Sequence, residues 1–252
     1  MKIDETLLTG DYLGKLLVVP YYAAATQGSF SGNINNGRAN VRELDKIKIF
    51  LDLSLKLKNP VLFDIGSCYG SYSFITLFNP KLKVEAFEPY PVMIEYMKDI
   101  IVLNNIPNIH LNEFGLSNES RMCDMKLGAK TNRAKLEINV GNTRIDTKKS
   151  GDFEFKSLDS LNIQQMDLVK IDVEGHEIEV FEGGIETFKH CKPIYIQVEI
   201  NTNDEKILKH ISNILNNEYT YTQYKEKFDS DYLFVCKDKN ISIPKWEAKS
   251  LF

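Results

Sequence analysis

The sequence predicts an α/β protein with a mostly parallel sheet, helices on both faces and an antiparallel hairpin at its C-terminal end. Two observations support this fold class. Short apolar segments that end in glycine, proline or an acidic residue alternate with longer segments whose apolar residues recur at helical spacing. Near the C-terminus, two strand-like segments follow each other without a helix between them. Such alternation is typical of parallel strands joined by crossover helices.

The elements are expected in a regular order. A first helix begins after Asn40 and ends at Asn59-Pro60, and a later one has Pro91 near its first turn, where proline is favoured. Strands are expected at residues 61–65, 83–88, 108–114, 167–172, 193–200, 219–224 and 232–236. Helices are expected at residues 41–57, 71–78, 92–103, 177–188 and 203–216, with an interruption at Gly183-Gly184.

The chain divides into an N-terminal segment, residues 1–59, and a main domain, residues 60–252. Residues 1–40 are rich in glycine, serine and asparagine and indicate an irregular chain before the first helix. At about residues 118–158, a polar segment punctuated by glycine interrupts the alternation of strands and helices. This break predicts a hairpin-rich insertion within the main domain.

The composition excludes several classes of protein. The 252 residues are 43% hydrophobic and 26% charged with a formal net charge of −4, so no overall positive field would attract nucleic acid. No apolar run approaches the roughly 18 to 20 residues that span a membrane. The four cysteines lack metal-ligand spacing and no secretory signal is recognised, which predicts reduced thiols in a cytoplasmic protein. The sequence leaves the oligomeric state undefined.

A glycine loop follows the first main-domain strand. Asp64 to Gly70 reads DIGSCYG, and Glu88 ends the next strand, where a carboxylate can accept hydrogen bonds from ribose hydroxyls. Asp64 would repel the pyrophosphate of a dinucleotide but attract the ammonium and sulfonium of S-adenosylmethionine. The loop therefore favours S-adenosylmethionine over NAD. The alternative is that the glycines only shape a turn and Glu88 only caps the following helix.

Charged residues gather where the strand at 167–172 ends. Ligands bind at the carboxyl ends of parallel strands, and here Asp172, Glu174 and His176 follow one another. Lys170 lies within the same strand. Because a strand in the middle of such a sheet is buried on both faces, a lysine in it needs a charged partner or a shifted pKa. This segment is the second candidate for the chemistry of the protein.

Leu168 to Gly184, LVKIDVEGHEIEVFEGG, resembles the signature of the FkbM family of S-adenosylmethionine-dependent methyltransferases. The segments FDIGSCYGSYS, AFEPYP, SLDSL and PIYIQVEIN also lie where that family has them, so the resemblance covers about Val61 to Asn201. It implies a Rossmann-like class I methyltransferase fold and S-adenosylmethionine as cofactor. It also implies an oxygen acceptor, commonly a hydroxyl of a sugar or a glycosylated natural product.

The resemblance and the motifs together predict the site residues. The cofactor-binding residues are expected to be Asp64, Gly66, Ser67, Tyr69, Gly70, Glu88, Pro89, Phe114, Gly115 and Asp172. The catalytic candidates are His176, Asp172, Glu174 and Lys170. His176 is ranked first because an imidazole titrates near neutral pH; the alternative is a histidine that caps the following helix or faces solvent.

A metal site is a further hypothesis. Asp172, Glu199 and Asn201 resemble the magnesium ligands of catechol-type O-methyltransferases, and oxygen ligands suit magnesium. The acid and the amide are not adjacent here, which departs from that pattern. The preferred alternative is an ion pair between Lys170 and Glu199 that supports the sheet.

We expect an S-adenosylmethionine-dependent O-methyltransferase that modifies a hydroxyl of a sugar, in a glycan or glycosylated metabolite. The N-terminal segment is expected to form a lid over this small-molecule or glycan acceptor, with the aromatic and amide candidates Tyr21, Tyr22, Gln27, Phe30 and Asn33, which equally fit packing and turn roles. The alternatives are an NAD(P)-dependent oxidoreductase of the same fold and a non-catalytic module that binds cofactor or glycan.

Overall fold

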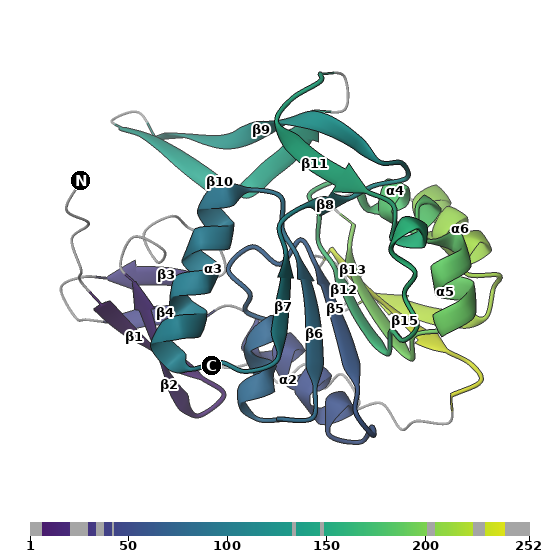
Figure 1. Ribbon diagram of the computed structural model, residues 1–252, viewed down its shortest axis with the longest axis horizontal. Coiled ribbons are helices and arrows are strands. Elements are labelled where there is room, and N and C mark those ends of the chain that lie inside the picture. Colours follow the sequence, from purple (N-terminus) through teal and green to yellow (C-terminus); the bar gives the residue numbers. More distant parts are fainter. Residues whose placement is uncertain are drawn as a thin grey trace.

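The computed structural model describes residues 7–20, 30–33, 38–41, 43–132, 135–146, 149–200, 205–223 and 230–239. Its centre is a sheet of seven strands in the order β14-β15-β13-β12-β5-β6-β7 (Figure 1). Their bounds are β5 (Val61–Ile65), β6 (Lys83–Phe87), β7 (Ile109–Asn112), β12 (Leu168–Ile171), β13 (Tyr195–Glu199), β14 (Tyr219–Gln223) and β15 (Asp231–Cys236). The first five in chain order run parallel, and β15 pairs antiparallel with β13 and β14. The predicted fold class is confirmed.

Helices cover both faces of this sheet because successive residues of the buried strands point to opposite faces and are apolar on both. Leu62 packs in the cluster that contains residues of α2 and α3, whereas the next residue, Phe63, packs in the cluster with residues of α4, α5 and α6. The helices are α2 (Leu44–Ser54), η2 (Ser73–Leu77), α3 (Pro91–Asn104), η3 (Leu158–Leu161), α4 (Glu177–Glu182), α5 (Ile185–Cys191) and α6 (Glu205–Ile214). The helix expected at 71–78 is reduced to the short 3-10 helix η2.

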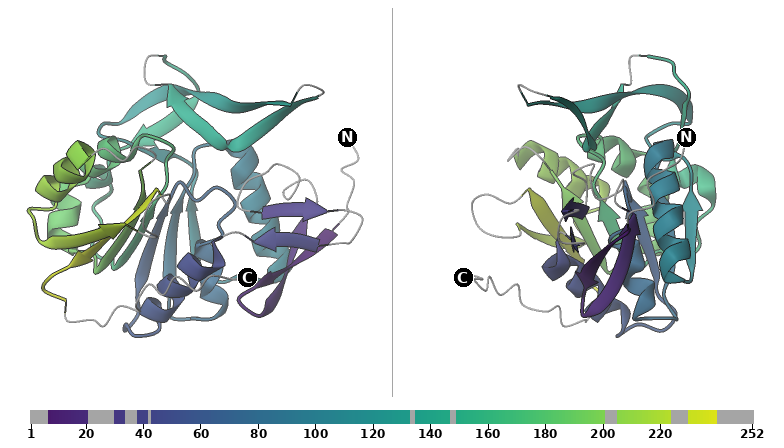
Figure 2. Two further views of the ribbon diagram at one scale, coloured as in Figure 1. Left: turned by 180° about the vertical axis from the view of Figure 1, so that it is seen from behind. Right: turned by 90° about the vertical axis from the view of Figure 1, so that its left-hand side faces the viewer.

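The N-terminal segment differs from its prediction. Instead of an irregular chain, it contains a four-stranded sheet in the order β2-β1-β4-β3, with β1 (Leu7–Tyr12), β2 (Lys15–Pro20), β3 (Phe30–Asn33) and β4 (Arg38–Val41). This sheet lies beside α3 (Figure 2), where the Asn104 side chain both donates to and accepts from the backbone of Val18. The helix expected at residues 41–57 is present as α2. The lid candidates Tyr21, Tyr22 and Gln27 lie outside the described residues.

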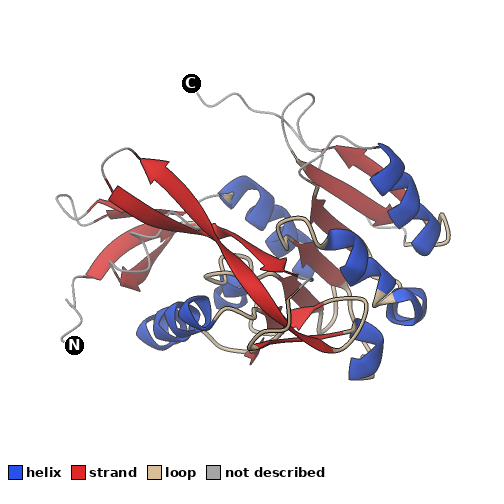
Figure 3. Ribbon diagram, turned by 90° about the horizontal axis from the view of Figure 1, so that it is seen from above, coloured by secondary structure: helices blue, strands red, loops and turns tan. Residues whose placement is uncertain are grey.

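The segment at 118–158 contains a long hairpin. The strands β8 (Gly115–Leu116), β9 (Arg121–Asn132), β10 (Lys135–Asp146) and β11 (Phe153–Lys156) form a sheet in the order β10-β9-β11-β8. Seen from the front and from above, the β9–β10 hairpin crosses over the end of the central sheet at which β6 leads into α3 (Figures 1 and 3). Arg144 on β10 lies 3.9 Å from Glu174, which follows β12. The insertion therefore reaches the carboxyl ends of the parallel strands.

Among the described helices, none has the length and apolar character that crossing a membrane requires.

Candidate active site

The glycine loop turns sharply after β5 and packs against the end of β12. Gly66 and Gly70 both have left-handed backbone angles, with φ of +75° and +81°. The backbone nitrogens of Gly66 and Ser67 both donate to the carbonyl of Phe87 at the end of β6. A Cβ atom at Gly66 would lie 1.9 Å from the carbonyl oxygen of Asp172. Glycine is required here by both the backbone conformation and the close approach.

Asp64, the last polar residue of β5, is buried beneath this loop with 2% of its surface exposed. The hydroxyl of Ser73 donates to its carboxylate at 2.6 Å. The pKa of Asp64 is raised to about 6, chiefly by burial and also by the negative charge of Asp172, although Ser73 and Lys170 act in the opposite direction. Asp64 therefore remains largely ionised at neutral pH and adds negative charge beneath the loop.

Glu88 ties the end of β6 to the glycine loop. Its carboxylate accepts hydrogen bonds from the backbone nitrogens of Cys68 at 3.0 Å and Tyr90 at 2.9 Å. Burial raises the pKa of Glu88 to about 7, with further contributions from Asp64 and Asp172. Three carboxylates at the ends of β5, β6 and β12 thus lie within electrostatic reach of one another.

The other residues of the predicted cofactor loop mainly shape it. Tyr69 is fully buried and stacks on Tyr96 with ring centroids 5.8 Å apart. A Cβ at Gly70 would lie 2.7 Å from a methyl of Met97, the residue whose sulfur lies 3.8 Å from the hydroxyl of Ser67. Of the predicted cofactor-binding residues, Tyr69 and Gly70 therefore lie in the core behind the loop.

Two predicted cofactor residues lie where the chain passes from β7 to β8. Phe114 packs edge-on against Phe87 at 5.8 Å, and the ammonium of Lys156 lies 4.1 Å from the centre of its ring. Gly115 is buried against the ring of Phe155, which a Cβ would approach to 2.3 Å. The insertion strand β11 therefore supplies the neighbours of both residues.

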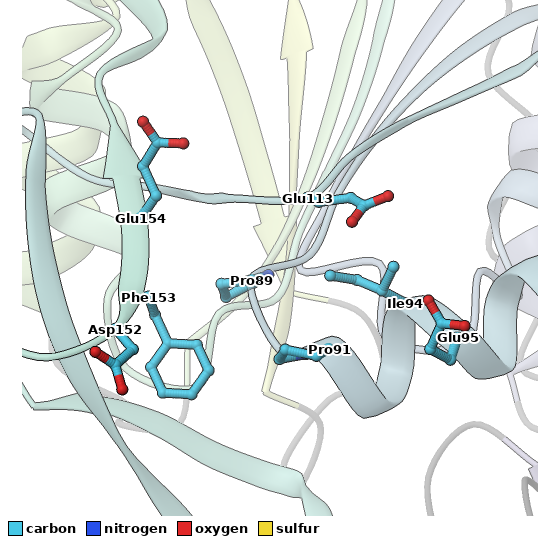
Figure 4. A pocket seen from close by; sticks show the side chains of 8 residues that line it. All are labelled: Pro89, Pro91, Ile94, Glu95, Glu113, Asp152, Phe153 and Glu154. Carbon is cyan, nitrogen blue, oxygen red and sulfur yellow. The ribbon is translucent and has the colours of Figure 1, made fainter.

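A cavity of about 360 Å³ opens beside Pro89, the residue that follows Glu88 in the chain, and Figure 4 shows its lining. Phe153 on β11 points toward Pro89 and Pro91, so the insertion and the start of α3 form two of its walls. The full lining is Pro89, Pro91, Ile94, Glu95, Glu113, Asp152, Phe153 and Glu154. The predicted residue Pro89 thus lines an open space with apolar walls and an acidic rim.

Lys170 occupies the middle of β12 with 2% of its surface exposed. Its ammonium lies 3.2 Å from Asp172 and 5.4 Å from the centre of the Tyr72 ring. The predicted ion pair with Glu199 is wrong, because the lysine pairs with Asp172, and Glu199 instead accepts a hydrogen bond from Ser230 at 2.9 Å. Burial, followed by the charge of Asp172, raises the pKa of Glu199 to about 8.

His176 is buried between the insertion and α4, with 4% of its surface exposed. Its Nε2 lies 2.9 Å from the hydroxyl of Ser117, and its Nδ1 lies 3.4 Å from a carboxylate oxygen of Glu179. Burial lowers the pKa of His176, and the positive charge of Arg121 contributes. The side chain neither caps α4 nor faces solvent. Because both ring nitrogens have partners, the geometry favours a neutral histidine that joins two elements over a free general base.

Glu174 is aimed toward the insertion by an unusual backbone. Its φ is +55°, and Gly175 follows at +99°. Non-glycine residues in this region are strained and concentrate at functional sites. Burial and the charge of Asp172 raise the pKa of Glu174 to about 7, while Arg144 acts in the opposite direction. Of the catalytic candidates, Glu174 and Asp172 are the two partly exposed carboxylates, with 20% and 28% of their side chains accessible.

The metal hypothesis receives no support. Within the described part of the chain, no group of three or more histidine, cysteine, aspartate or glutamate residues could hold a metal ion. Of the predicted ligands, Asp172 already pairs with the ammonium of Lys170 at 3.2 Å, and Glu199 accepts a hydrogen bond from Ser230. Asn201, the third predicted ligand, lies outside the described residues.

These strand ends and loops correspond to a known domain. The family model described as the Methyltransferase FkbM domain matches residues 64–222. The chain belongs to the FkbM methyltransferase family. The matched segment begins at Asp64 and includes Glu88, the loop after β12 and the insertion. Methyl transfer is therefore the activity of the family to which these residues belong.

Two relatives of the FkbM-family chain illustrate the similarity. The hexuronic acid methyltransferase AglP of Haloferax volcanii is 24% identical over 188 residues, which cover 74% of this chain and 75% of that protein. The crystal structure of methyltransferase FkbM from Methylobacillus flagellatus KT matches 71% of this chain with 13% identity and a TM-score of 0.50. The chain spans 44% of the length of that solved protein. At this identity, the structural match shows the fold alone.

Sequence reasoning missed a group of polar residues beneath the strand ends of the FkbM-family domain. Gln197 is fully buried and donates to Asp231 at 2.8 Å and to the hydroxyl of Tyr72 at 3.0 Å. Asp231 also forms an ion pair with Lys46 on α2. The only signal was that Gln197 shares a face with Glu199 by the two-residue period of a strand. Nothing local indicates that Lys46 and Asp231 meet.

Proposed function

We propose that this FkbM-family protein is an S-adenosylmethionine-dependent O-methyltransferase whose acceptor is a sugar hydroxyl in a glycan or glycosylated metabolite. The observation that carries the cofactor assignment is the gathering of Asp64, Glu88 and Asp172 at the ends of three adjacent strands. The negative charges of Asp64 and Asp172 both raise the pKa of Glu88, and Asp172 also raises that of Asp64. A site with this excess of carboxylates attracts a cation.

The residues present suit S-adenosylmethionine. Glu88 is held by two backbone nitrogens, and its remaining lone pairs can accept hydrogen bonds from ribose hydroxyls. Asp64 and Asp172 suit the ammonium and sulfonium charges, whereas a pyrophosphate would meet repulsion. When bound, this cofactor supplies a methyl group on a positively charged sulfur. The family match and the carboxylates together favour methyl transfer over the nicotinamide-dependent alternative.

A sugar hydroxyl must lose its proton as its oxygen gains the methyl group, which requires a base at the same strand ends. Glu174 and Asp172 are carboxylates with accessible side chains there. His176 already uses both ring nitrogens in contacts with Ser117 and Glu179. We therefore assign proton removal to the carboxylates after β12 and a supporting role to His176.

The position of Arg144 further restricts the chemical class of the proposed acceptor. Its side chain is 58% accessible and lies 3.9 Å from Glu174, beyond hydrogen-bond distance. An exposed guanidinium next to the base can pair with the carboxylate of an acidic sugar. The relative from Haloferax volcanii is named as a hexuronic acid methyltransferase. We therefore propose glycans that contain a hexuronic acid as the first acceptors to test.

The experiment is a panel of glycans and nucleotide sugars, each with and without a uronic acid, incubated with methyl-labelled S-adenosylmethionine and analysed by mass spectrometry. We expect label on a uronic acid acceptor, stable to mild alkali as an ether is. Alkali-labile label would show transfer to the carboxylate and contradict O-methylation of a hydroxyl. Binding of cofactor and glycan without any labelled product would instead indicate a non-catalytic module.

A further inference from the structure

Lys46 and Asp231 form a buried ion pair whose two residues both lie outside the matched segment 64–222. Lys46 belongs to α2 and Asp231 begins β15, and their exposed fractions are 8% and 1%. Taking two charges out of water is costly, so a buried pair of this kind is weak support for stability by itself. The position of the Lys46–Asp231 pair relative to β12 and β13 indicates its role.

The sheet register brings this pair close to Lys170. Lys170 lies opposite Gln197 on β13, and Glu199, two residues further along, lies opposite Asp231 on β15. Gln197 donates to one carboxylate oxygen of Asp231 at 2.8 Å, and Lys46 pairs with the other. Asp231 therefore lies on the same polar face as Lys170 and is held there from two sides.

Four carboxylates act on Lys170: Asp172 most strongly, then Asp231, Glu43 and Glu199, and Glu43 also pairs with Lys46 at 3.0 Å. Burial by itself would lower the pKa of Lys170, but Asp172 and then Asp231 raise it above its usual value. Its ammonium contacts Asp172 at 3.2 Å without a well-directed hydrogen bond within the described residues. Because the Lys170 side chain is long and held mainly by charge, its ammonium can turn toward a second carboxylate without losing a directed hydrogen bond.

We infer that Lys46 and Asp231 are positioning residues: Lys46 neutralises Asp231, so that Lys170 stays paired with Asp172 at the end of β12. The inference rests on the proposed function, in which Asp172 faces the cofactor and the acceptor. Asp231 is 1% exposed, whereas 28% of the Asp172 side chain is accessible. Because charges attract more strongly where water is excluded, an Asp231 without Lys46 would compete successfully for Lys170.

The test combines crystal structures with steady-state kinetics of Lys46→Met, Lys46→Arg and the double variant Lys46→Met/Asp231→Asn. The control is Lys192→Met, which removes a surface ion pair with Glu218 at 3.0 Å. In Lys46→Met, we expect Lys170 to leave Asp172 for Asp231 and kcat to fall about tenfold or more, with S-adenosylmethionine affinity retained. Lys46→Arg keeps the charge and retains activity. The double variant returns Lys170 to Asp172 and restores kcat to within about threefold.

The inference is wrong if Lys170 remains on Asp172 in crystals of Lys46→Met, or if the double variant loses as much kcat as the single variant. Should Lys46→Met fail to fold, Lys46→Gln, which can still donate a hydrogen bond to Asp231 but carries no charge to neutralise it, decides the question by its kcat and its Lys170 contact. The crystal readout needs neither cofactor nor acceptor. A wild-type protein without methyl transfer would therefore refute the proposed function but leave the position of Lys170 as a separate result.

Discussion

Glu88 accepts a hydrogen bond from the backbone nitrogen of Cys68 at 3.0 Å, so the acid that ends β6 is fixed directly to the glycine loop that follows β5. Cys68 has a left-handed φ of +50°, a conformation that residues other than glycine rarely adopt. The carboxylate therefore holds the loop in shape and remains available to a ligand. Replacing Glu88 should therefore weaken cofactor binding more than it slows methyl transfer.

Replacing Glu88 by Gln should weaken S-adenosylmethionine binding about tenfold to a hundredfold, because hydrogen bonds to a charged group contribute about 1.5–3 kcal/mol. Isothermal titration calorimetry measures the loss. Glu85→Gln, on the same strand but partly exposed and paired with His110 at 2.7 Å, is the matched control and should bind normally. Equal losses in both variants would remove Glu88 from the cofactor site.

The affinity for S-adenosylmethionine should depend on pH through Glu88. Burial raises the pKa of Glu88 to about 7, so its carboxylate becomes protonated as the pH falls through neutrality. Below pH 7, affinity should decline by up to about tenfold per pH unit, because the neutral acid neither attracts the cation nor accepts as strongly. Asp64, with a pKa of about 6, adds to the decline at lower pH. Calorimetry from pH 5 to pH 9 should show a shallower decline in Glu88→Gln; an unchanged profile would assign the titration elsewhere.

A comparison of Gly66→Ala with Gly14→Ala separates the stability lost to backbone strain from the stability lost to an atomic clash. Both glycines have positive φ, +75° and +86°, but only a Cβ at Gly66 meets another atom, the Asp172 carbonyl oxygen at 1.9 Å. Gly14→Ala should lower the free energy of unfolding by about 1 kcal/mol. Gly66→Ala should cost at least about 2 kcal/mol more and abolish cofactor binding, since loop and strand end must separate. Urea denaturation gives both values, and similar losses would contradict the close packing of loop and β12.

We expect His176 to hold neighbouring elements in place and not to act as the general base. His176→Gln and Ser117→Ala both break the 2.9 Å contact between the imidazole and the serine hydroxyl, so both should lower Tm and reduce kcat by less than about tenfold. Loss of a general base costs about 10²–10⁴-fold. A kcat that falls by that factor in His176→Gln, while Ser117→Ala remains active, would identify His176 as the base.

The central sheet could be predicted because its signals are local. Val61 to Ile65 is a short run, apolar except for Asp64, that Gly66 follows, and the break at Gly183-Gly184 marks the boundary between α4 and α5. Glu88 could be placed at the end of the second strand because Pro89 and Pro91 follow it directly. These features depend on residues close together in the sequence.

The features that could not be predicted depend on distant contacts. The N-terminal sheet is built from strands of four to six residues, too short for a clear period, and Tyr12 anchors it by donating to the carbonyl of Ser71 at 2.5 Å. The burial of His176 depends on Ser117, 59 residues away. Lys46 and Asp231 are separated by 185 residues. Their pairing follows only from the packing of α2 against the sheet.

The most direct test of the account is a calorimetric titration of the wild-type protein with S-adenosylmethionine, NAD⁺ and NADP⁺ at pH 8, where Glu88 is ionised. We expect saturable binding of S-adenosylmethionine at one site and no binding of either nicotinamide cofactor. Binding of NAD⁺ or NADP⁺ without binding of S-adenosylmethionine would contradict it.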